Sequence, residues 1–250
     1  MTRFSESQAC EKQLSVALVV VGNEVLSGDT LDTNGNYLAK RLSEIGHSLE
    51  LIVTIRDSFE AFEEFVAPVI KRFDIVITSG GIGPTPDDIT RDAVARIFGV
   101  GVAEHPEALR MLTEFYGDRM NDNARRMALL PEGATLVPNV RTGAPGFRIG
   151  NVYCFAGVPQ IFQDMFEAIA PSLGGFPLSR AEFTTNIGES RFSHAMRDAC
   201  AKFPAVEIGS YPRLGGEYRV KLVFKGRDAK AVEECCRFLK AAIEAIETNE

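Results

Sequence analysis

The sequence predicts an α/β protein in which helices cover both faces of a mostly parallel sheet in three layers, followed by a small α+β domain. Apolar β-branched runs alternate three times with amphipathic helical patterns in the first hundred residues, which is the order of βα crossover units. From residue 176 onward the patterns instead follow the order β-α-β-β-α. A Pro- and Gly-rich stretch, 171–177, separates these parts, so we predict domains at 14–172 and 176–250.

Composition restricts the function classes that the chain can serve. A hydrophobic content of 45% is typical of a globular core, and a net charge of −7 disfavours nucleic acid as the main partner. No apolar run approaches the roughly 18 residues that cross a bilayer, so no membrane association is expected. Residues 1–13 lack a signal-like apolar segment and are expected to form a disordered leader of a cytoplasmic protein. The five scattered cysteines favour free thiols over disulfides or zinc.

The first strand is predicted over Ser15–Val21, a continuous apolar run of the kind buried on both sheet faces. A loop bounded by glycines follows at 22–28, and a helix begins near Thr33 and ends at Gly46. The second strand is expected over Leu51–Ile55. Asp57 begins a D-x-x-E sequence that is typical of a capping box, so a helix should start there. Its buried side is predicted to carry Phe62, Phe65, Val66, Val69 and Phe73.

The third strand, 75–78, leads into the sequence T-S-G-G-I-G-P-T-P-D-D-I-T at 78–90 and a helix that ends at Gly99. Further helices are predicted over 106–116, 121–129 and 159–170, and short strands over 135–137, 147–149 and 152–155. In the second domain we expect strands over 182–187, 206–211 and 218–224, with helices near 192–203 and 229–248.

The glycine loop is the main functional candidate. Glycines at 80, 81 and 83 allow positive φ and a close approach of backbone N–H groups to a ligand, and the following helix N-terminus favours an anion. Asp87 and Asp88 add negative charge, which indicates a metal or an acid/base group beside a phosphate. The alternative is a tight strand-to-helix turn with an aspartate cap. Because two adjacent carboxylates cannot both cap the helix, one is expected to be free for a metal.

Three polar loops should meet at one edge of the sheet, because 22–28, Asp57 and 80–88 each follow a strand. Glu24 is either a metal-orienting residue or a solvated loop carboxylate, and Asp57 either acts in chemistry or only caps its helix. Ser27 and Asn34 can donate to phosphate or organise a turn. Arg126 and Arg141 are the cations that could offset a diphosphate, although such residues are commonly solvated surface.

Several of these segments resemble a known family. Residues 22–28 with Thr33-Asn34, then 78–90, 144–147 and 156–159, resemble the molybdopterin-binding (MoaB/Mog-like) domain family, in the form found at the N-terminus of competence/damage-inducible protein A (CinA). The sequence G-S-Y-P at 209–212 resembles the segment that follows in CinA. Full-length CinA continues into a nicotinamide-nucleotide amidase domain that this sequence does not contain, so amidase activity is not expected.

The resemblance implies a homo-oligomer that binds an ADP-containing nucleotide or a pterin. One associated activity is metal-dependent cleavage of a dinucleotide pyrophosphate of the ADP-ribose or FAD type. Another is adenylyl transfer to molybdopterin in molybdenum cofactor biosynthesis, and a third reading is a non-catalytic binding module. An RNA-binding role of the small domain is disfavoured, since it lacks a basic stripe and stacking aromatics.

The resemblance and the loops together assign roles to individual residues. Asp57 and Asp88 are the predicted catalytic carboxylates. Mg²⁺ or another divalent metal is expected on Asp88, Asp87 and Glu24. The predicted substrate-binding residues are Gly22, Glu24, Ser27, Gly28, Asn34, Ser79, Gly80, Gly81, Gly83, Pro84, Thr90, Asn123, Arg126, Pro145 and Gly146.

Overall fold

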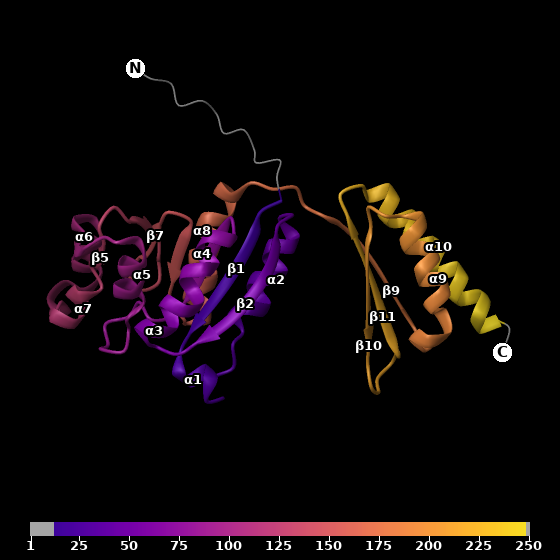
Figure 1. Cartoon of the computed structure of the whole chain (residues 1–250), viewed down its shortest axis with the longest axis horizontal. Coiled ribbons are helices and arrows are strands. Elements are labelled where there is room, and N and C mark those ends of the chain that lie inside the picture. Colours follow the sequence, from indigo (N-terminus) through magenta and orange to yellow (C-terminus); the bar gives the residue numbers. More distant parts are fainter. Residues whose placement is uncertain (1–12, 249–250) are drawn as a thin grey trace, which may run out of the picture. The chain divides into compact units, whose positions relative to one another are not determined.

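The computed structural model describes residues 13–248, which fall into two compact units, Met1–Gly175 and Phe176–Glu250 (Figure 1). The predicted leader lies, except for residue 13, outside the described residues. Among the helices of residues 13–248, none is long and apolar enough to cross a membrane.

A six-stranded sheet forms the centre of the first unit, in the order β2-β1-β3-β8-β7-β6. The first four of these run parallel, β7 is antiparallel to β8, and β6 is antiparallel to β7, so the predicted mostly parallel sheet is confirmed. Their bounds are β1 Ser15–Val21, β2 Ser48–Ile55, β3 Ile75–Ser79, β6 Thr135–Val137, β7 Gly146–Ile149 and β8 Val152–Phe155. In the register, Leu18 of β1 lies between Ile52 and Ile77.

Helices cover both faces of this sheet, which makes the three predicted layers (Figure 1). Successive β1 residues face opposite sides, so Leu18 packs with α2 and α8 while Val19 packs with the α3–α6 layer. This double coverage explains why the middle of β1 is entirely apolar. The helices are α2 Asn34–Glu44, α3 Phe59–Ala61, the π-turn η1 Phe62–Val66, α4 Ala67–Arg72, α5 Thr90–Phe98, α6 Pro106–Tyr116 and α8 Pro159–Leu173.

Two predicted segments differ at the edges of the sheet. The loop at 22–28 contains a single helical turn, α1 Asn23–Leu26. The helix predicted over 121–129 is shorter, α7 Asp122–Arg126, because Leu129 begins a strand. This strand, β5 Leu129–Pro131, pairs with β4 Val102–Glu104, and the 3-10 turn η2 Gly117–Arg119 precedes α7.

The capping box at Asp57 was a wrong prediction. Ser58 is the helix cap, and its hydroxyl accepts the Ala61 N–H at 3.2 Å. Asp57 instead accepts the Asn23 N–H at 2.9 Å, which joins the ends of β1 and β2. The predicted buried side was also wrong at Phe65, which is 44% exposed. The π-turn η1 inserts one residue into the helical repeat ahead of Pro68, and this rotates Phe65 outward.

The end of α8 was predicted at Ala170, but the helix continues to Leu173 with Pro171 inside its last turn. Leu173 is buried among the residues that pack on α2, so tertiary packing extends the helix past the proline. The two units divide after Gly175, which has a φ of 104°.

The second unit is a three-stranded antiparallel sheet in the order β10-β11-β9, with two helices on one face (Figure 1). Its elements are β9 Ser179–Thr185, α9 Glu189–Lys202, β10 Glu207–Pro212, β11 Val220–Gly226 and α10 Ala229–Thr248. Phe192, Phe224 and Leu239 are buried in its core. The predicted β-α-β-β-α order is confirmed, although β9 begins before the predicted Glu182 because its pairing with β11 extends to Ser179.

Candidate functional site

The glycine loop after β3 has a defined hydrogen-bond pattern toward α5. The Gly80 carbonyl accepts the Thr90 hydroxyl at 2.9 Å, and the Gly81 carbonyl accepts the Thr90 N–H at 3.0 Å. The next carbonyl, of Ile82, accepts the Arg91 Nη1–H at 2.9 Å. Because C=O and N–H point in opposite directions in a trans peptide, the N–H groups of Gly81 and Ile82 point away from α5. Neither N–H has an acceptor among the described residues.

Asp88 fixes the other end of the same loop. Its carboxylate accepts the N–H groups of Gly83 and Thr85, each at 2.8 Å, and the Thr85 hydroxyl at 2.5 Å. The first residue of α5 has no side-chain cap, so the alternative in which an aspartate caps this helix is wrong. The structure therefore uses Asp88 to hold the loop, while Asp87 extends from it with an exposed side chain.

A cavity of about 590 Å³ opens where β1, β2 and β3 end. The three loops predicted to meet all contribute to its lining: Gly22 and Glu24 after β1, Asp57 after β2, and the glycine loop after β3. Its other side is closed by Asn139, Thr142, Ala144, Pro145, Ala156, Gly157, Val158, Pro159 and Ile161. At Gly22 a Cβ atom would lie 2.6 Å from the Glu24 carboxylate, so glycine is needed for this side chain to fold back.

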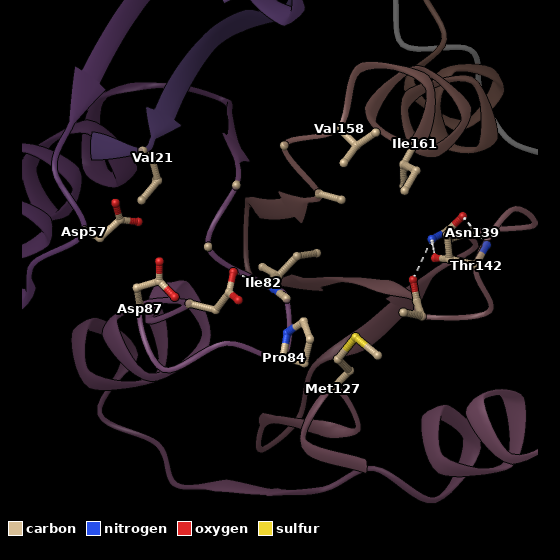
Figure 2. A pocket seen from close by; sticks show the side chains of 18 of the residues that line it. Val21, Asp57, Ile82, Pro84, Asp87, Met127, Asn139, Thr142, Val158 and Ile161 are labelled. Atoms are coloured by element: carbon tan, nitrogen blue, oxygen red, sulfur yellow. Dashed lines mark hydrogen bonds between the residues drawn. The ribbon is translucent and has the colours of Figure 1, made fainter. Parts of the chain in front are cut away.

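One end of the cavity is acidic. Figure 2 shows Asp57 and Asp87 near one another at this end, and Glu24 lines it as well. Burial raises the pKa of Asp57, the charges of Glu24 and Asp87 add to this, and the Asn23 N–H opposes it. With Asp88, four carboxylates line the cavity, and among the described residues no lysine, arginine or histidine does.

The opposite end is apolar, with Met127, Val158 and Ile161 facing the cavity beyond the glycine loop (Figure 2). Asn139 is 3% exposed and holds the rim, because its amide donates to the Thr142 hydroxyl at 2.6 Å and to the Ala144 carbonyl at 2.8 Å. Sequence reasoning named Pro145 and Gly146 in this part of the chain but missed Asn139 and the apolar side chains. Single apolar residues occur in every segment of the chain, so no sequence signal distinguished them.

The other predicted binding residues occupy several places. Asn34 and Ser79 line a smaller recess of about 70 Å³, where the Asn34 amide donates to the Ser79 hydroxyl and the Gly157 carbonyl, both at 2.8 Å. Thr90 lies behind the glycine loop and is fully buried. The predicted residues that line the main cavity are Gly22, Glu24, Asp57, Gly80, Gly81, Gly83, Pro84, Asp87, Asp88 and Pro145.

A last group is not brought to the cavity. Ser27 donates to the Glu24 carbonyl and to Asp29. Arg141 forms an ion pair with Asp164. Gly28, Asn123, Arg126 and Gly146 also lie outside the lining. The arginines expected to offset a diphosphate are therefore absent from the lining within the described part of the chain.

The fold and the cavity together define a ligand-binding α/β protein with its site at the carboxyl ends of parallel strands. Residues 17–175 match the family model described as "Probable molybdopterin binding domain", and residues 177–250 match "FAD synthase, middle domain". The chain belongs to this molybdopterin-binding domain family, in the CinA-like form that the sequence motifs predicted.

Relatives of known sequence agree with this assignment. A protein of Archaeoglobus fulgidus is 32% identical over 220 residues, which cover 88% of this chain and 94% of the relative. A CinA-like protein of Citrifermentans bemidjiense is 39% identical over 218 residues, 78% of this chain and 53% of the relative. A putative competence-damage inducible protein of Symbiobacterium thermophilum is 35% identical over 227 residues, with shares of 84% and 53%. The chain thus spans about half the length of these last two.

A solved structure resembles the first unit. The crystal structure of the protein CinA with unknown function from Thermoplasma acidophilum matches with a TM-score of 0.60 and 26% identity. The match covers 64% of this chain and 98% of that one. The predicted MoaB/Mog-like fold is therefore confirmed.

Proposed function

We propose that this chain is a metal-dependent pyrophosphatase that cleaves a dinucleotide diphosphate of the ADP-ribose or FAD type. The observation that carries the proposal is the charge of the cavity, which has four carboxylates and no basic side chain in its lining among the described residues. Two N–H groups that have no acceptor in the described part of the chain, on Gly81 and Ile82, are suited to an anion at the same place. A phosphate beside so many carboxylates requires a divalent cation to offset the repulsion.

The available donors fit such a cation. Glu24 and Asp87 offer hard carboxylate oxygens at the acidic end, whereas the Asp88 oxygens already accept three hydrogen bonds from the loop. No three His, Cys, Asp or Glu side chains of the described residues converge closely enough to hold a metal alone. Mg²⁺ is commonly held by one or two carboxylates together with substrate phosphates and water, which is the arrangement we propose. When bound, the ion would offset phosphate charge and make water more acidic.

The two ends of the cavity match the two parts of the proposed ligand. Its volume of about 590 Å³ lies within the usual range for small-molecule sites. The diphosphate would lie at the acidic end and the glycine loop, and the adenine ring would lie against Met127, Val158 and Ile161. A molybdopterin ring is a second ligand that this end could hold.

Asp57 is the proposed general base, because its raised pKa makes it a better proton acceptor than an ordinary aspartate. In the proposed reaction the oxygen of a water molecule bonds to one phosphorus, and the bond from that phosphorus to the bridging oxygen breaks. One water proton passes to Asp57, and the bridging oxygen leaves with the other phosphate. ADP-ribose would yield AMP and ribose 5-phosphate.

The main alternative is adenylyl transfer to molybdopterin in molybdenum cofactor biosynthesis. It is supported by the family model that matches 17–175. In that reaction a molybdopterin phosphate oxygen replaces water, attacks the α-phosphorus of ATP, and displaces pyrophosphate. A binding module without turnover is a third reading. The carboxylates count against it, because negative charge without a metal weakens the binding of an anion.

The test is to incubate the full chain with Mg²⁺ and, separately, ADP-ribose, FAD, or ATP with molybdopterin, and to follow AMP and pyrophosphate. The proposal predicts AMP from ADP-ribose or FAD, and loss of this activity with EDTA. If pyrophosphate forms only in the presence of molybdopterin, the chain is an adenylyltransferase and the proposed pyrophosphatase is wrong. Nucleotide binding without any turnover would leave the binding module.

Carboxamide variants make this test specific to the site. Asp57→Asn and Asp87→Asn each remove a charge at the acidic end and should lower turnover at least 100-fold. Asp118→Asn removes an exposed carboxylate outside the cavity and is the matched control. Equal activity of all three variants would contradict the proposed roles.

A further inference from the structure

A buried cation lies directly behind the glycine loop. Arg91, in the first turn of α5, is 3% exposed and is the one arginine or lysine among the buried residues that the structure describes. Its Nη1–H donates to the Ile82 carbonyl at 2.9 Å. No carboxylate of the described residues lies within ion-pairing distance of it. The side chain therefore gives up hydration without gaining a direct ion pair.

A buried charge of this kind is costly to the free protein. Burial lowers the pKa of Arg91, and the nearby charge of Arg126 lowers it further, while Asp92 and Asp88 oppose this. An arginine used only to pack the loop against α5 could be replaced by an apolar side chain at a smaller cost in desolvation. A negative charge on the cavity side of the loop would add to the compensation of the cation, because Arg91 binds the carbonyl of Ile82, a residue that lines the cavity.

The hydrogen bond of Arg91 completes a consecutive series. Thr90 holds the carbonyls of Gly80 and Gly81, and Arg91 holds that of Ile82. The two Thr90 bonds keep the N–H groups of Gly81 and Ile82 on the side of the loop that lines the cavity. The Arg91 bond fixes the next peptide, Ile82–Gly83, whose N–H is directed to Asp88. Loss of the Arg91 bond would release the carbonyl end of Ile82, so that the residue whose N–H faces the cavity would be held on one side only.

We infer that Arg91 is a positioning residue for the phosphate of the ligand, acting through the Ile82 peptide and through its unpaired charge. The inference rests on the proposed function, in that it takes the cavity to hold a phosphorylated ligand. Arg91 does not touch the ligand in this arrangement. It fixes the carbonyl end of Ile82 and supplies a positive charge behind the loop, where the cavity lining of the described residues has none.

Inorganic pyrophosphate with Mg²⁺ is the probe, titrated calorimetrically into the wild-type chain and its variants. Arg91→Met removes the donor and the charge and should weaken pyrophosphate binding about 10- to 100-fold. Arg91→Lys keeps the charge and should stay within about 10-fold of wild type. Arg96→Met is the matched control, because Arg96 lies on the same helix with an exposed side chain, and it should change nothing.

Amide NMR separates positioning from a general loss of structure. In the wild type, pyrophosphate should shift the Gly81 and Ile82 amide signals most, and in Arg91→Met these responses should shrink while signals from the apolar end stay in place. Should Arg91→Met not fold, Arg91→Gln, which keeps a donor without charge, takes its place. Binding equal to the Arg96→Met control, or a lysine variant no better than the methionine variant, overturns the inference.

The outcomes also separate this inference from the proposed function. If wild-type protein binds pyrophosphate in an Arg91-dependent manner yet cleaves no dinucleotide, the pyrophosphatase is wrong and the role of Arg91 stands. If wild-type protein cleaves ADP-ribose and Arg91→Met cleaves it with unchanged affinity, the pyrophosphatase stands and the role of Arg91 is refuted. If wild-type protein binds no pyrophosphate, the role of Arg91 is refuted.

Discussion

Gly81 and Gly99 offer a matched test of how tightly the glycine loop is built against α5. Their φ angles are nearly equal, 70° and 68°, so replacement by alanine carries the same left-handed backbone cost at both positions, about 1 to 2 kcal/mol. The surroundings differ. A Cβ atom at Gly81 would lie 2.2 Å from the Thr90 hydroxyl, whereas one at Gly99 would have no atom of the described residues within 4 Å apart from its chain neighbours.

The overlap at Gly81 should add to the backbone cost. Moving Thr90 aside costs about 1 to 3 kcal/mol by analogy with overpacked cores, and loss of its hydrogen bond to Gly80 costs about 1 kcal/mol more. The reduced entropy of the unfolded chain is common to both variants and cancels. Gly81→Ala should therefore be about 2 to 4 kcal/mol less stable than Gly99→Ala.

Thermal unfolding of the two variants measures this difference. For a unit of this size, roughly 2 to 4 °C accompanies each kcal/mol, so the two melting temperatures should differ by roughly 5 to 15 °C. Adding Thr90→Ala to Gly81→Ala removes the overlapping hydroxyl and should recover part of the loss, which a double-mutant cycle would detect. Equal melting temperatures for Gly81→Ala and Gly99→Ala would refute the reasoning.

Three further predictions follow from the cavity and its surroundings. Asp57→Asn should stabilise the free protein at pH 7 while it lowers turnover at least 100-fold. The pKa of Asp57 is raised from 3.8, so folding favours the protonated form of this carboxyl. The stability gained by Asp57→Asn over wild type should therefore be absent below pH 3.8, grow as Asp57 ionises in the wild type, and then level off. Unfolding of both proteins at several pH values would measure this gain. A gain that shrinks as pH rises would contradict this. Ile161→Ala should weaken ADP-ribose binding about 10-fold and leave pyrophosphate binding unchanged, and calorimetry that finds both weakened would exclude an apolar ring site. Arg141→Ala breaks an exposed ion pair with Asp164 and should change ligand affinity by less than about twofold and stability by less than about 1 kcal/mol. A larger loss of affinity would indicate that Arg141 contacts the ligand.

Local patterns were sufficient for the architecture. Apolar runs such as Ser15–Val21 and the alternation of strands and helices predict the parallel sheet, because each run needs cover on both faces. The rule that polar loops gather at the carboxyl ends of parallel strands was enough to predict that Glu24, Asp57 and Asp87 share a cavity. The predicted ends of helices were wrong where tertiary packing outweighed local sequence signals. Leu173, for example, stays helical beyond Pro171 because its side chain is buried.

The roles of individual carboxylates were decided by tertiary structure. Asp57 looked like a helix cap, but the neighbouring loop presents the Asn23 N–H to it and leaves the capping to Ser58. Asp88 looked like the free metal ligand, but its oxygens hold the Gly83 and Thr85 N–H groups. Both outcomes depend on backbone N–H donors. The fold sets the directions of these donors, and the identity of the residues does not predict them.

The charge of the site was decided in the same way. Sequence alone determined that this chain has a glycine loop with two aspartates at the edge of a parallel sheet. It could not determine that Arg141 turns to a surface carboxylate while Arg91 is buried behind the loop. Long side chains have many rotamers, and only the packed surroundings select one. Which charges face a ligand is therefore a property of the folded chain.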